Sequence, residues 1–302
     1  MKTSRRQFLQ HTTTVIAATA FGAPLVGGLG CSSTDSNHHA KRHLKKAIMY
    51  DTIGYKGTVL EKFRALKVAG FDGVELSSHM NQDEVVRALD ESGLKAASVC
   101  GSKHWSKTLS HQDEKVRGEG LEALKQTIRD AKRYGATSVL LVPGTVNKDV
   151  TYEQCWERSI AGIRAALPLC EETGVKIANE NVWNNFIMKP QQAKDYLDAI
   201  NSPFVGWHFD IGNMIKFGPS EEWIKVLGQR ILKLHIKEYG TAPGKGFGVK
   251  FFEGDNHWPA IMAELDKVGY TGWAITEQPG NQTKDAESLK EFSALLDKVL
   301  AS

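Results

Sequence analysis

From Lys46 onward, the chain alternates between short runs of apolar and β-branched residues and longer segments with apolar residues three or four positions apart. The first pattern is typical of buried strands and the second of amphipathic helices. The short runs predict strands at Lys46–Tyr50, Gly73–Leu76, Lys95–Cys100, Ser138–Val142, Lys176–Asn181, Val205–Ile211, Ile231–Ile236 and Trp273–Glu277. The longer segments include Val59–Ala69, Glu114–Tyr134, Tyr152–Thr173 and Asp285–Leu300. Glycines that suit left-handed helix ends are Gly70, Gly93, Gly135, Gly174 and Gly269.

Eight predicted strands, each followed by a helix, favour a single α/β domain with the architecture of a (β/α)8 TIM barrel. A doubly wound sheet is the weaker alternative, because no Rossmann or P-loop motif follows the first strand. We expect the catalytic barrel domain to span residues 46–302. Residues of a barrel strand alternate between the interior and the helix layer, and chemistry gathers at the carboxyl ends of the strands.

Residues 1–31 form a leader that is set apart from the fold, because SRRQFLQ at residues 4–10 resembles a twin-arginine export signal. Its last residues, LGC, resemble the end of a bacterial lipoprotein signal in which Cys31 becomes lipidated. Cleavage after Ala20 or Ala23 is the alternative. Residues 32–45 are polar and are expected to form a flexible linker. We therefore expect an exported, periplasmic protein that uses the twin-arginine machinery and is anchored to a membrane if Cys31 is lipidated.

The net charge of the chain argues against nucleic acid as a partner. The leader holds Lys2, Arg5 and Arg6 and no acidic residue, so the formal net charge of +3 becomes zero for the remainder. Nucleic-acid-binding proteins gather an excess of lysine and arginine instead. The three cysteines after Cys31 fit neither a disulfide framework nor a zinc motif, and we expect them to be small buried residues.

Polar residues share one face of the predicted strands near their carboxyl ends. In GWHFDIGN, His208 and Asp210 lie opposite three apolar residues. The preceding strand ends in Glu180, and the next two strands carry His235 and Glu277. Three carboxylates at close range would repel one another and would tend to stay protonated. A divalent cation removes this conflict, because carboxylates and imidazole are good ligands for it.

These residues resemble the sugar phosphate isomerase/epimerase group of xylose isomerase-like barrels, through the Asp of HFDIGN, the His of LHIKEY and the Glu of ITEQPG. The resemblance runs from about residue 46 to the end of the chain. It implies that Glu180, Asp210, His235 and Glu277 bind one divalent metal ion, which would be Mn, Mg, Co or Zn. It also implies that Glu180 and Glu277 are catalytic and move the substrate proton.

Two departures separate the chain from the ketohexose epimerases of that group. Those enzymes carry a further Glu six residues after the first ligand, where this chain has Phe186, and an Arg six residues after the His, where it has Thr241. Both groups handle the substrate in that subfamily, which makes ketohexose epimerisation itself a poorer match. The related apurinic endonucleases use more histidines for three zinc ions, and that pattern is missing here.

Further side chains are expected at the same rim, where a carbohydrate substrate would lie. The residues expected to contact it are Glu75, His104, Trp105, Trp183, Lys237 and Lys245. His208 lies one layer below Asp210 and is expected to support a ligand instead of touching the substrate. Trp258 also falls in a rim loop, although ordinary packing is the alternative reading for each tryptophan.

The segment after the seventh strand predicts a loop and then a helix. GTAPGKGFG, residues 240–248, is rich in glycine and is expected to be a mobile lid with Lys245 at its centre. The helix that follows is expected to begin with Asp255 or Asn256 as its N-cap and with Pro259 in its first turn.

Three functions fit this pattern. The first is a metal-dependent sugar isomerase or epimerase that removes a proton next to the carbonyl of a ketose or keto-sugar. The second is a lyase or hydrolase that cleaves 3-keto-glycosides by β-elimination. The third is a non-catalytic sugar-binding lipoprotein. Proton exchange separates the third from the others, and release of an aglycone separates the second from the first. The sequence leaves the sugar and the oligomeric state open.

Overall fold

The computed structural model describes residues 43–302, which form a closed barrel of parallel strands. The strands are β1 (Lys45–Met49), β2 (Gly73–Ser77), β3 (Lys95–Cys100), β4 (Ser138–Leu141), β5 (Lys176–Glu180), β6 (Val205–Asp210), β7 (Ile231–Ile236) and β8 (Trp273–Thr276). Each strand pairs with its neighbours in sequence, and β8 pairs with β1 to close the ring. The predicted (β/α)8 fold is therefore confirmed, and the doubly wound sheet was the wrong alternative because such a sheet stays open.

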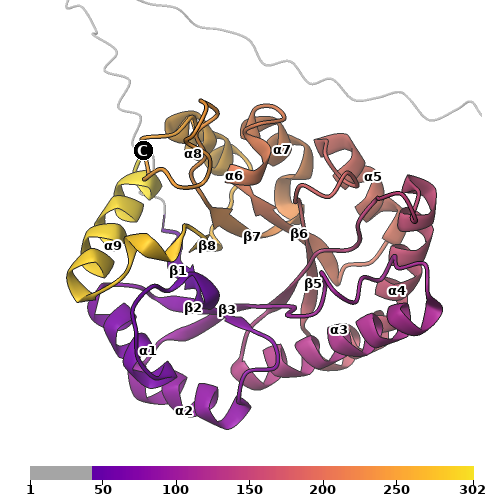
Figure 1. The fold of residues 1–302 in the computed structure, drawn as a ribbon, viewed down its shortest axis with the longest axis horizontal. Coiled ribbons are helices and arrows are strands. Elements are labelled where there is room, and N and C mark those ends of the chain that lie inside the picture. The colour runs from indigo at the N-terminus through magenta and orange to yellow at the C-terminus, as the bar shows by residue number, and fades with distance from the viewer. Residues whose placement is uncertain (1–42) are drawn as a thin grey trace, which may run out of the picture. The chain divides into compact units, whose positions relative to one another are not determined.

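Helices surround the ring of strands, as Figure 1 shows. They are α1 (Val59–Val68), α2 (Gln82–Ser92), α3 (Glu114–Tyr134), α4 (Tyr152–Thr173), α5 (Pro190–Ile200), α6 (Ile211–Met214), α7 (Ser220–Leu227), α8 (Trp258–Lys267) and α9 (Ala286–Leu300). Short 3-10 turns occupy Tyr50–Thr52, Gly228–Arg230 and Gly280–Gln282. Within residues 43–302, no helix has both the length and the apolar character needed to cross a bilayer. The predicted leader with Cys31 lies outside the described residues, as does the linker up to residue 42.

The helix ends follow the local sequence signals closely. At the start of α1, the Thr58 hydroxyl accepts from the Glu61 N–H, and the Glu61 carboxylate accepts from the Thr58 N–H, which forms a capping box. α3 ends at Gly135, whose φ of 76° lies in the left-handed region that glycine adopts without strain. Such ends fix the length of each helix, and thereby where the next strand enters the barrel.

The start of α8 differs from the prediction. The residue that precedes α8 is His257, which makes no side-chain cap, so neither Asp255 nor Asn256 caps the helix. The Asp255 carboxylate accepts instead from the N–H and the hydroxyl of Thr241, both at 2.5 Å. The Asn256 amide donates to the Lys237 carbonyl at 2.8 Å. Both side chains tie down the loop after β7 and are therefore not free to cap the helix.

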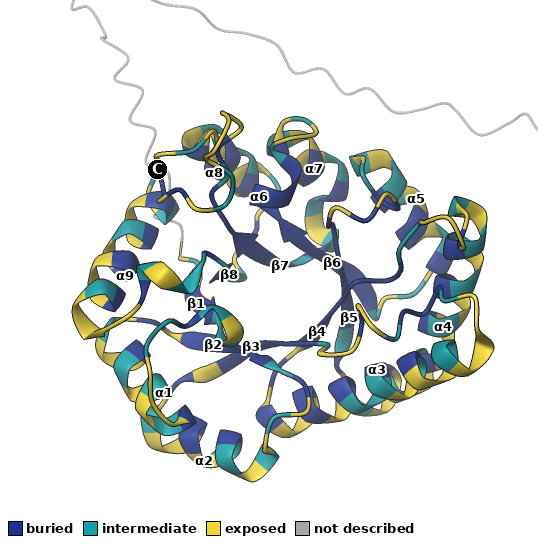
Figure 2. Cartoon of the chain, viewed as in Figure 1, coloured by how far each residue is buried: buried dark blue, intermediate teal, exposed yellow. Residues whose placement is uncertain are grey.

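Two interiors of different character build the molecule. The large apolar core lies between the strands and the surrounding helices, whose inner sides are buried in Figure 2. It also contains two of the three free cysteines of residues 43–302, Cys155 and Cys170, and Cys100 is buried as well, as predicted. Inside the ring of strands, the apolar cluster is small and centres on Ala47, Ala97 and Ile275. Barrel interiors are usually filled by bulky apolar residues, so this polar interior is the candidate functional site.

Candidate metal centre

The four predicted ligands come together at the carboxyl ends of β5 to β8. Glu180 and Asp210 are the last residues of β5 and β6, His235 lies near the end of β7, and Glu277 directly follows β8. The His235 Nδ1 atom is 3.0 Å from Glu180 Oε1, 3.3 Å from Glu277 Oε2 and 3.8 Å from Asp210 Oδ2. One ligand atom from each of the four residues lies within 4.8 Å of the others. The structure therefore gathers the predicted set into one cup of donor atoms.

Local hydrogen bonds hold Asp210 in place. Its Oδ1 atom accepts from the Asn213 N–H at 2.8 Å, because Asp210 is also the N-cap of the single-turn helix α6. The Asn181 side chain accepts from the Asp210 N–H at 3.0 Å and donates to the Asp210 carbonyl at 2.7 Å. One carboxylate oxygen is thus engaged by the backbone, and the other points toward the remaining ligands.

Lys237 brings a positive charge into the same cup. Its Nζ atom lies 2.8 Å from Asp210 Oδ2 and 2.5 Å from Glu277 Oε2. The Phe247 ring covers this ammonium, with its centroid 4.8 Å from Nζ. Burial alone would lower the pKa of Lys237, but Asp210, Glu277 and Glu180 outweigh it and raise that pKa. Lys237 therefore stays charged beside the carboxylates, on the face where the sequence placed it.

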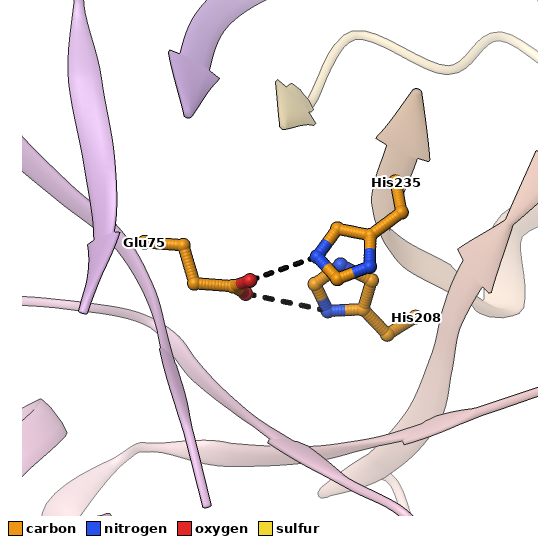
Figure 3. A group of neighbouring side chains, drawn as sticks. All are labelled: Glu75, His208 and His235. Carbon is orange, nitrogen blue, oxygen red and sulfur yellow. Dashed lines mark hydrogen bonds and ion pairs between the residues drawn. The ribbon is translucent and has the colours of Figure 1, made fainter. Parts of the chain in front are cut away.

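A second group lies beneath the cup and consists of Glu75, His208 and His235 (Figure 3). The Glu75 Oε2 atom is 2.8 Å from His235 Nε2, and Glu75 Oε1 is 3.8 Å from His208 Nδ1. A proton on Nε2 of His235 would satisfy Glu75 and would leave Nδ1, which faces the other three ligands, free to bind a cation. Glu75 is therefore placed to fix the tautomer and the orientation of His235.

This position corrects the expectation that Glu75 reaches the rim to contact substrate. Glu75 pairs in register with Met49 and Ser98, in the middle layer of the barrel, and its side chain is fully buried. The reason is that β2 does not end at Glu75 but continues through Leu76 to Ser77, so the rim lies beyond it. His208 is equally buried and lies beneath Asp210 as expected, with its ring centroid 4.1 Å from that of His235.

The charges of the cup shift several pKa values in opposite directions. Burial raises the pKa of Glu180 to about 7, and the negative charges of Glu277 and Asp210 add to this rise against the opposing effect of His235. Burial would also raise the pKa of Glu277, but Lys237 and His235 outweigh it and lower that pKa. Burial would lower the pKa of His235, but Glu75 and Glu277 raise it. Without a further cation, the cup holds protons to balance its carboxylates.

These residues fit a divalent cation in charge and in donor type. Around the cup, Glu180, Asp210 and Glu277 supply three carboxylates, and the ammonium of Lys237 offsets one of them. One doubly charged cation balances the other two, with His235 neutral. Carboxylate oxygens and one imidazole suit hard or borderline metals, so Glu180, Asp210, His235 and Glu277 could hold such an ion.

A cavity of about 280 Å³ opens above the cup. Its floor includes Glu180, His235, Lys237 and Glu277, and its walls are largely apolar. The residues that line the walls include Met49, Cys100, His104, Trp105, Leu140, Val182, Trp183 and Phe247. Polar groups converge at the bottom of an apolar pocket, which is the usual form of a small-molecule site.

The predicted substrate contacts divide into two groups in the structure. His104, Trp105, Trp183 and Lys237 line the cavity. Burial lowers the pKa of His104 to about 4, and its Nδ1 atom accepts from the Val142 N–H at 3.3 Å, so the imidazole is neutral. Trp105 and Trp183 keep 54% and 40% of their surfaces exposed, although the Trp183 ring also packs against Phe247 and carries the Lys216 ammonium 4.8 Å from its centroid.

Lys245 and Trp258 do not line this cavity. The Lys245 ammonium donates to the Glu253 carbonyl at 3.1 Å, and its loop is closed by two backbone hydrogen bonds between Gly240 and Gly246. Trp258 is almost fully buried in the core and donates to the Glu238 carboxylate at 2.7 Å. Both expectations rested on loop position, and the path of a loop is not set by hydrophobic periodicity.

Sequence reasoning missed several residues of the site. Phe247 covers Lys237 from the same loop in which Lys245 was expected to act. Asn213 lines the cavity, and its place three residues after Asp210 is a capping signal that could have revealed it. Asn181 had no such signal, because its side chain bonds to the backbone of Asp210 and to the indole of Trp207, both on another strand.

The two positions that depart from the ketohexose epimerases lie away from the cavity. Phe186 is buried against Tyr152, Trp156 and Tyr196 in the helix layer. Thr241 is bonded to Asp255. Neither residue is among those that line the cavity. Neither therefore replaces the charged Glu or Arg that ketohexose epimerases carry at these positions.

Comparisons with known proteins agree with this architecture. A family model described as "Xylose isomerase-like TIM barrel" matches residues 63–298. The L-ribulose-5-phosphate 3-epimerase UlaE of Salmonella paratyphi C is 27% identical over 236 residues, which cover 72% of this chain and 81% of the relative. UlaE of Escherichia coli (strain K12 / DH10B) is 25% identical over 240 residues, which cover 75% and 84% of the two chains.

Solved structures share the fold at lower identity. The apo form of 3-keto-D-glucoside 4-epimerase YcjR from E. coli has a TM-score of 0.73 and 17% identity, covering 85% of this chain and 98% of that one. The zinc-bound IOLI protein has a TM-score of 0.72 and 19% identity, with coverage of 85% and 98%. D-psicose 3-epimerase of Clostridium cellulolyticum H10 with D-tagatose has a TM-score of 0.71 and 19% identity, with coverage of 86% and 100%. At these identities the similarity describes the fold alone.

Proposed function

The chain belongs to the xylose isomerase-like TIM barrel family, and we propose that it is a metal-dependent sugar epimerase. The proposed reaction moves a proton at a carbon next to a carbonyl of a keto-sugar. The observation that carries the proposal is the pair of Glu180 and Glu277, which stand three strands apart on the ring and line one cavity. Two carboxylates so placed can remove a proton and return one, as an epimerisation requires.

The residues of the cup have separate roles in this proposal. A divalent cation held by Glu180, Asp210, His235 and Glu277 supplies Lewis-acid polarisation of the substrate carbonyl when it is bound. One of the two glutamates takes the proton from the substrate carbon, and the other delivers a proton to it. Lys237 donates hydrogen bonds at the floor of the cavity, where oxygen atoms of the sugar would lie. The Trp105 and Trp183 rings exclude water from the mouth and offer planes for the apolar face of a sugar.

The cavity favours an unphosphorylated sugar. Among the residues that line it, the only lysine is Lys237, and this ammonium is already paired with Asp210 and Glu277. A neutral His104 adds no charge. A phosphate group carries up to two negative charges, and the only cationic side chain that this lining offers is the ammonium of Lys237, already offset by two carboxylates. The sugar phosphate named for the UlaE relatives is therefore a poor match for this cavity.

A second candidate reaction uses the same proton abstraction. In a 3-keto-glycoside, loss of the proton at C2 can expel the substituent at C1 by β-elimination, which makes the protein a lyase, or a hydrolase if water then adds. The positions of Phe186 and Thr241 favour a substrate other than a free ketohexose, because neither supplies the charged group that ketohexose epimerases carry there. A non-catalytic sugar-binding role remains the third alternative.

One experiment separates the three functions. The full-length protein is loaded with Mn, Mg, Co or Zn and is incubated in D₂O with 3-keto-glucosides and with free ketoses. An epimerase introduces deuterium next to the carbonyl and inverts that centre, and a lyase releases the aglycone. A binding protein does neither. Unlabelled substrate with every metal would contradict both enzymatic proposals.

We also propose that the protein is exported through the twin-arginine route and is anchored by Cys31. The support is the leader sequence itself, with its paired Arg5 and Arg6. Replacing both arginines with lysine is expected to leave the precursor in the cytoplasm. Cys31→Ala is expected to move the exported protein from the membrane fraction to the soluble one. Normal export of the first variant would contradict the signal, and an unchanged membrane fraction of the second would contradict the anchor.

A further inference from the structure

The amino-terminal end of the barrel carries lysines on alternate strands. One lysine lies near the start of each odd-numbered strand, β1, β3, β5 and β7. Each of these lysines stands two residues before a side chain that points into the barrel. These lysines are Lys45, Lys95, Lys176 and Lys233. Because side chains of a strand alternate between its faces, the four share the interior face of the ring. The amino-terminal end of the barrel is therefore basic, and the carboxylate cup lies at the other end.

Lys233 is the most deeply buried of the four. Only 5% of its surface is exposed. Among the described residues, its ammonium donates one hydrogen bond, to the Thr137 hydroxyl at 2.9 Å. An ammonium has three N–H donors, so two remain for another partner. Within residues 43–302, the Lys233 ammonium forms no ion pair with a carboxylate.

A cavity of about 540 Å³ opens at Lys233. Its lining includes Lys176, Ser138 and Thr137, and it contains no acidic residue. The Ser138 hydroxyl is buried and has no hydrogen-bond partner among the described residues. Asp72, which lies at the start of β2, accepts from the Lys46 N–H at 2.8 Å and is not part of the lining. The lining thus presents donors and positive charge and has no carboxylate of its own; the carboxylate that acts on Lys233 from inside the barrel is that of Glu75.

We propose that this cavity binds a small oxyanion, with Lys233 as its main ligand and Lys176 and Ser138 beside it. Removing an ammonium from water is costly unless a charged or hydrogen-bonding partner replaces the water. A phosphate or carboxylate group supplies that partner, and charge-assisted hydrogen bonds to it are short and strong. Thr137 orients the ammonium, and the hydroxyl of Ser138 adds a neutral donor.

The proposed site is distinct from the metal centre. Lys233 is the third residue of β7 and Lys237 directly follows that strand, so the two are four residues apart, which corresponds to roughly 13 Å along an extended chain. The inference is independent of the proposed enzymatic function, because no residue that lines this cavity belongs to the carboxylate cup. An anion bound here would stabilise the closed ring at its amino-terminal face, which in such barrels usually serves stability, whereas the opposite face serves catalysis.

The test measures binding of inorganic phosphate and of acetate to the metal-free, full-length protein by calorimetry at pH 7. Saturable binding of one anion per chain is expected, and the two probes separate a phosphate from a carboxylate source. Lys233→Met removes the charge while keeping an unbranched side chain, and is expected to weaken binding at least about tenfold. Lys176→Met is expected to weaken it less. Lys67→Met, an exposed lysine on α1, is the matched control and should bind as the native chain does.

A second measurement locates the anion and stands if Lys233→Met fails to fold. Lysines of the native chain are acetylated with acetic anhydride, with and without phosphate, and are quantified by mass spectrometry. Protection of Lys233 and Lys176, with Lys237 and Lys67 unchanged, supports the site. The proposal is overturned if neither anion binds saturably, if Lys176→Met and Lys233→Met bind like the control, or if protection falls on Lys237 instead.

Discussion

The two ends of this barrel use the same strand alternation to opposite effect. At the carboxyl end, β5 to β8 deliver three carboxylates and an imidazole, and at the amino end, the odd-numbered strands deliver lysines. The acidic end is braced, because Asn213 and Asn181 hold Asp210 and Glu75 holds His235. At the basic end, the Lys233 ammonium has one hydrogen-bond partner among residues 43–302, the Thr137 hydroxyl. Firmly positioned ligand atoms suit the chemistry that we propose at the acidic end, whereas the less constrained ammonium suits the anion binding that we propose at the basic end.

The largest expected effect is on proton transfer at the acidic end. Glu180→Gln and Glu277→Gln should each retain much of the metal, because an amide oxygen can still coordinate, and should lose at least about 10²-fold in solvent deuterium exchange. Exchange into recovered substrate and product is followed by NMR. Glu91→Gln, at an exposed position on α2, is the control and should exchange normally. If both variants exchange at the native rate, the two carboxylates serve as ligands only.

Metal affinity should distinguish the two ends next. Asp210→Ala and His235→Ala each remove a ligand and should lose bound metal, whereas Lys233→Met should retain it. At a metal concentration 100-fold above the native dissociation constant, binding stabilises the native chain by about 2.7 kcal/mol, and the two ligand variants should lose most of this gain. Metal analysis and thermal unfolding with and without metal measure both effects. Full occupancy in Asp210→Ala and His235→Ala would contradict the proposed centre.

The support of His235 by Glu75 should give a smaller effect. Glu75→Gln keeps the volume and an acceptor oxygen but removes the charge that favours a proton on His235 Nε2. Loss of such an outer partner typically weakens metal binding by about 10-fold or more, and that is the expected shift in the metal dissociation constant. Glu91→Gln again serves as the control. An unchanged dissociation constant, with the fold intact by circular dichroism, would reduce Glu75 to a packing role.

The strands and the clustering of the four candidate ligands could be predicted from the sequence, because both depend on a period of two. Asp210 follows His208 at that period, and the register then carries His235 beside Asp210. The depth of a residue inside the barrel could not be predicted, because it depends on the stagger between strands. Glu75 is the example, since β2 continues two residues beyond it, to Ser77, and its carboxylate lies beside His208 and His235 below the rim. Loop contacts such as that between Asp255 and Thr241 have no periodic signal at all.

The smallest expected effect concerns the loop that borders the acidic end, where Lys245 and Phe247 make a matched pair. Lys245 does not line the cavity. It is exposed and donates to the Glu253 carbonyl, so Lys245→Ala should change kcat/KM by less than about twofold, as surface substitutions usually do.

Phe247 lines the cavity, covers Lys237 and packs edge to face on Tyr239 with centroids 4.7 Å apart. Phe247→Ala should therefore raise KM several-fold, because it opens the cavity wall to water. Steady-state kinetics of both variants on the substrate found by deuterium exchange decide the matter. A larger loss in Lys245→Ala than in Phe247→Ala would show that the loop rearranges when substrate binds and brings the lysine to the site after all.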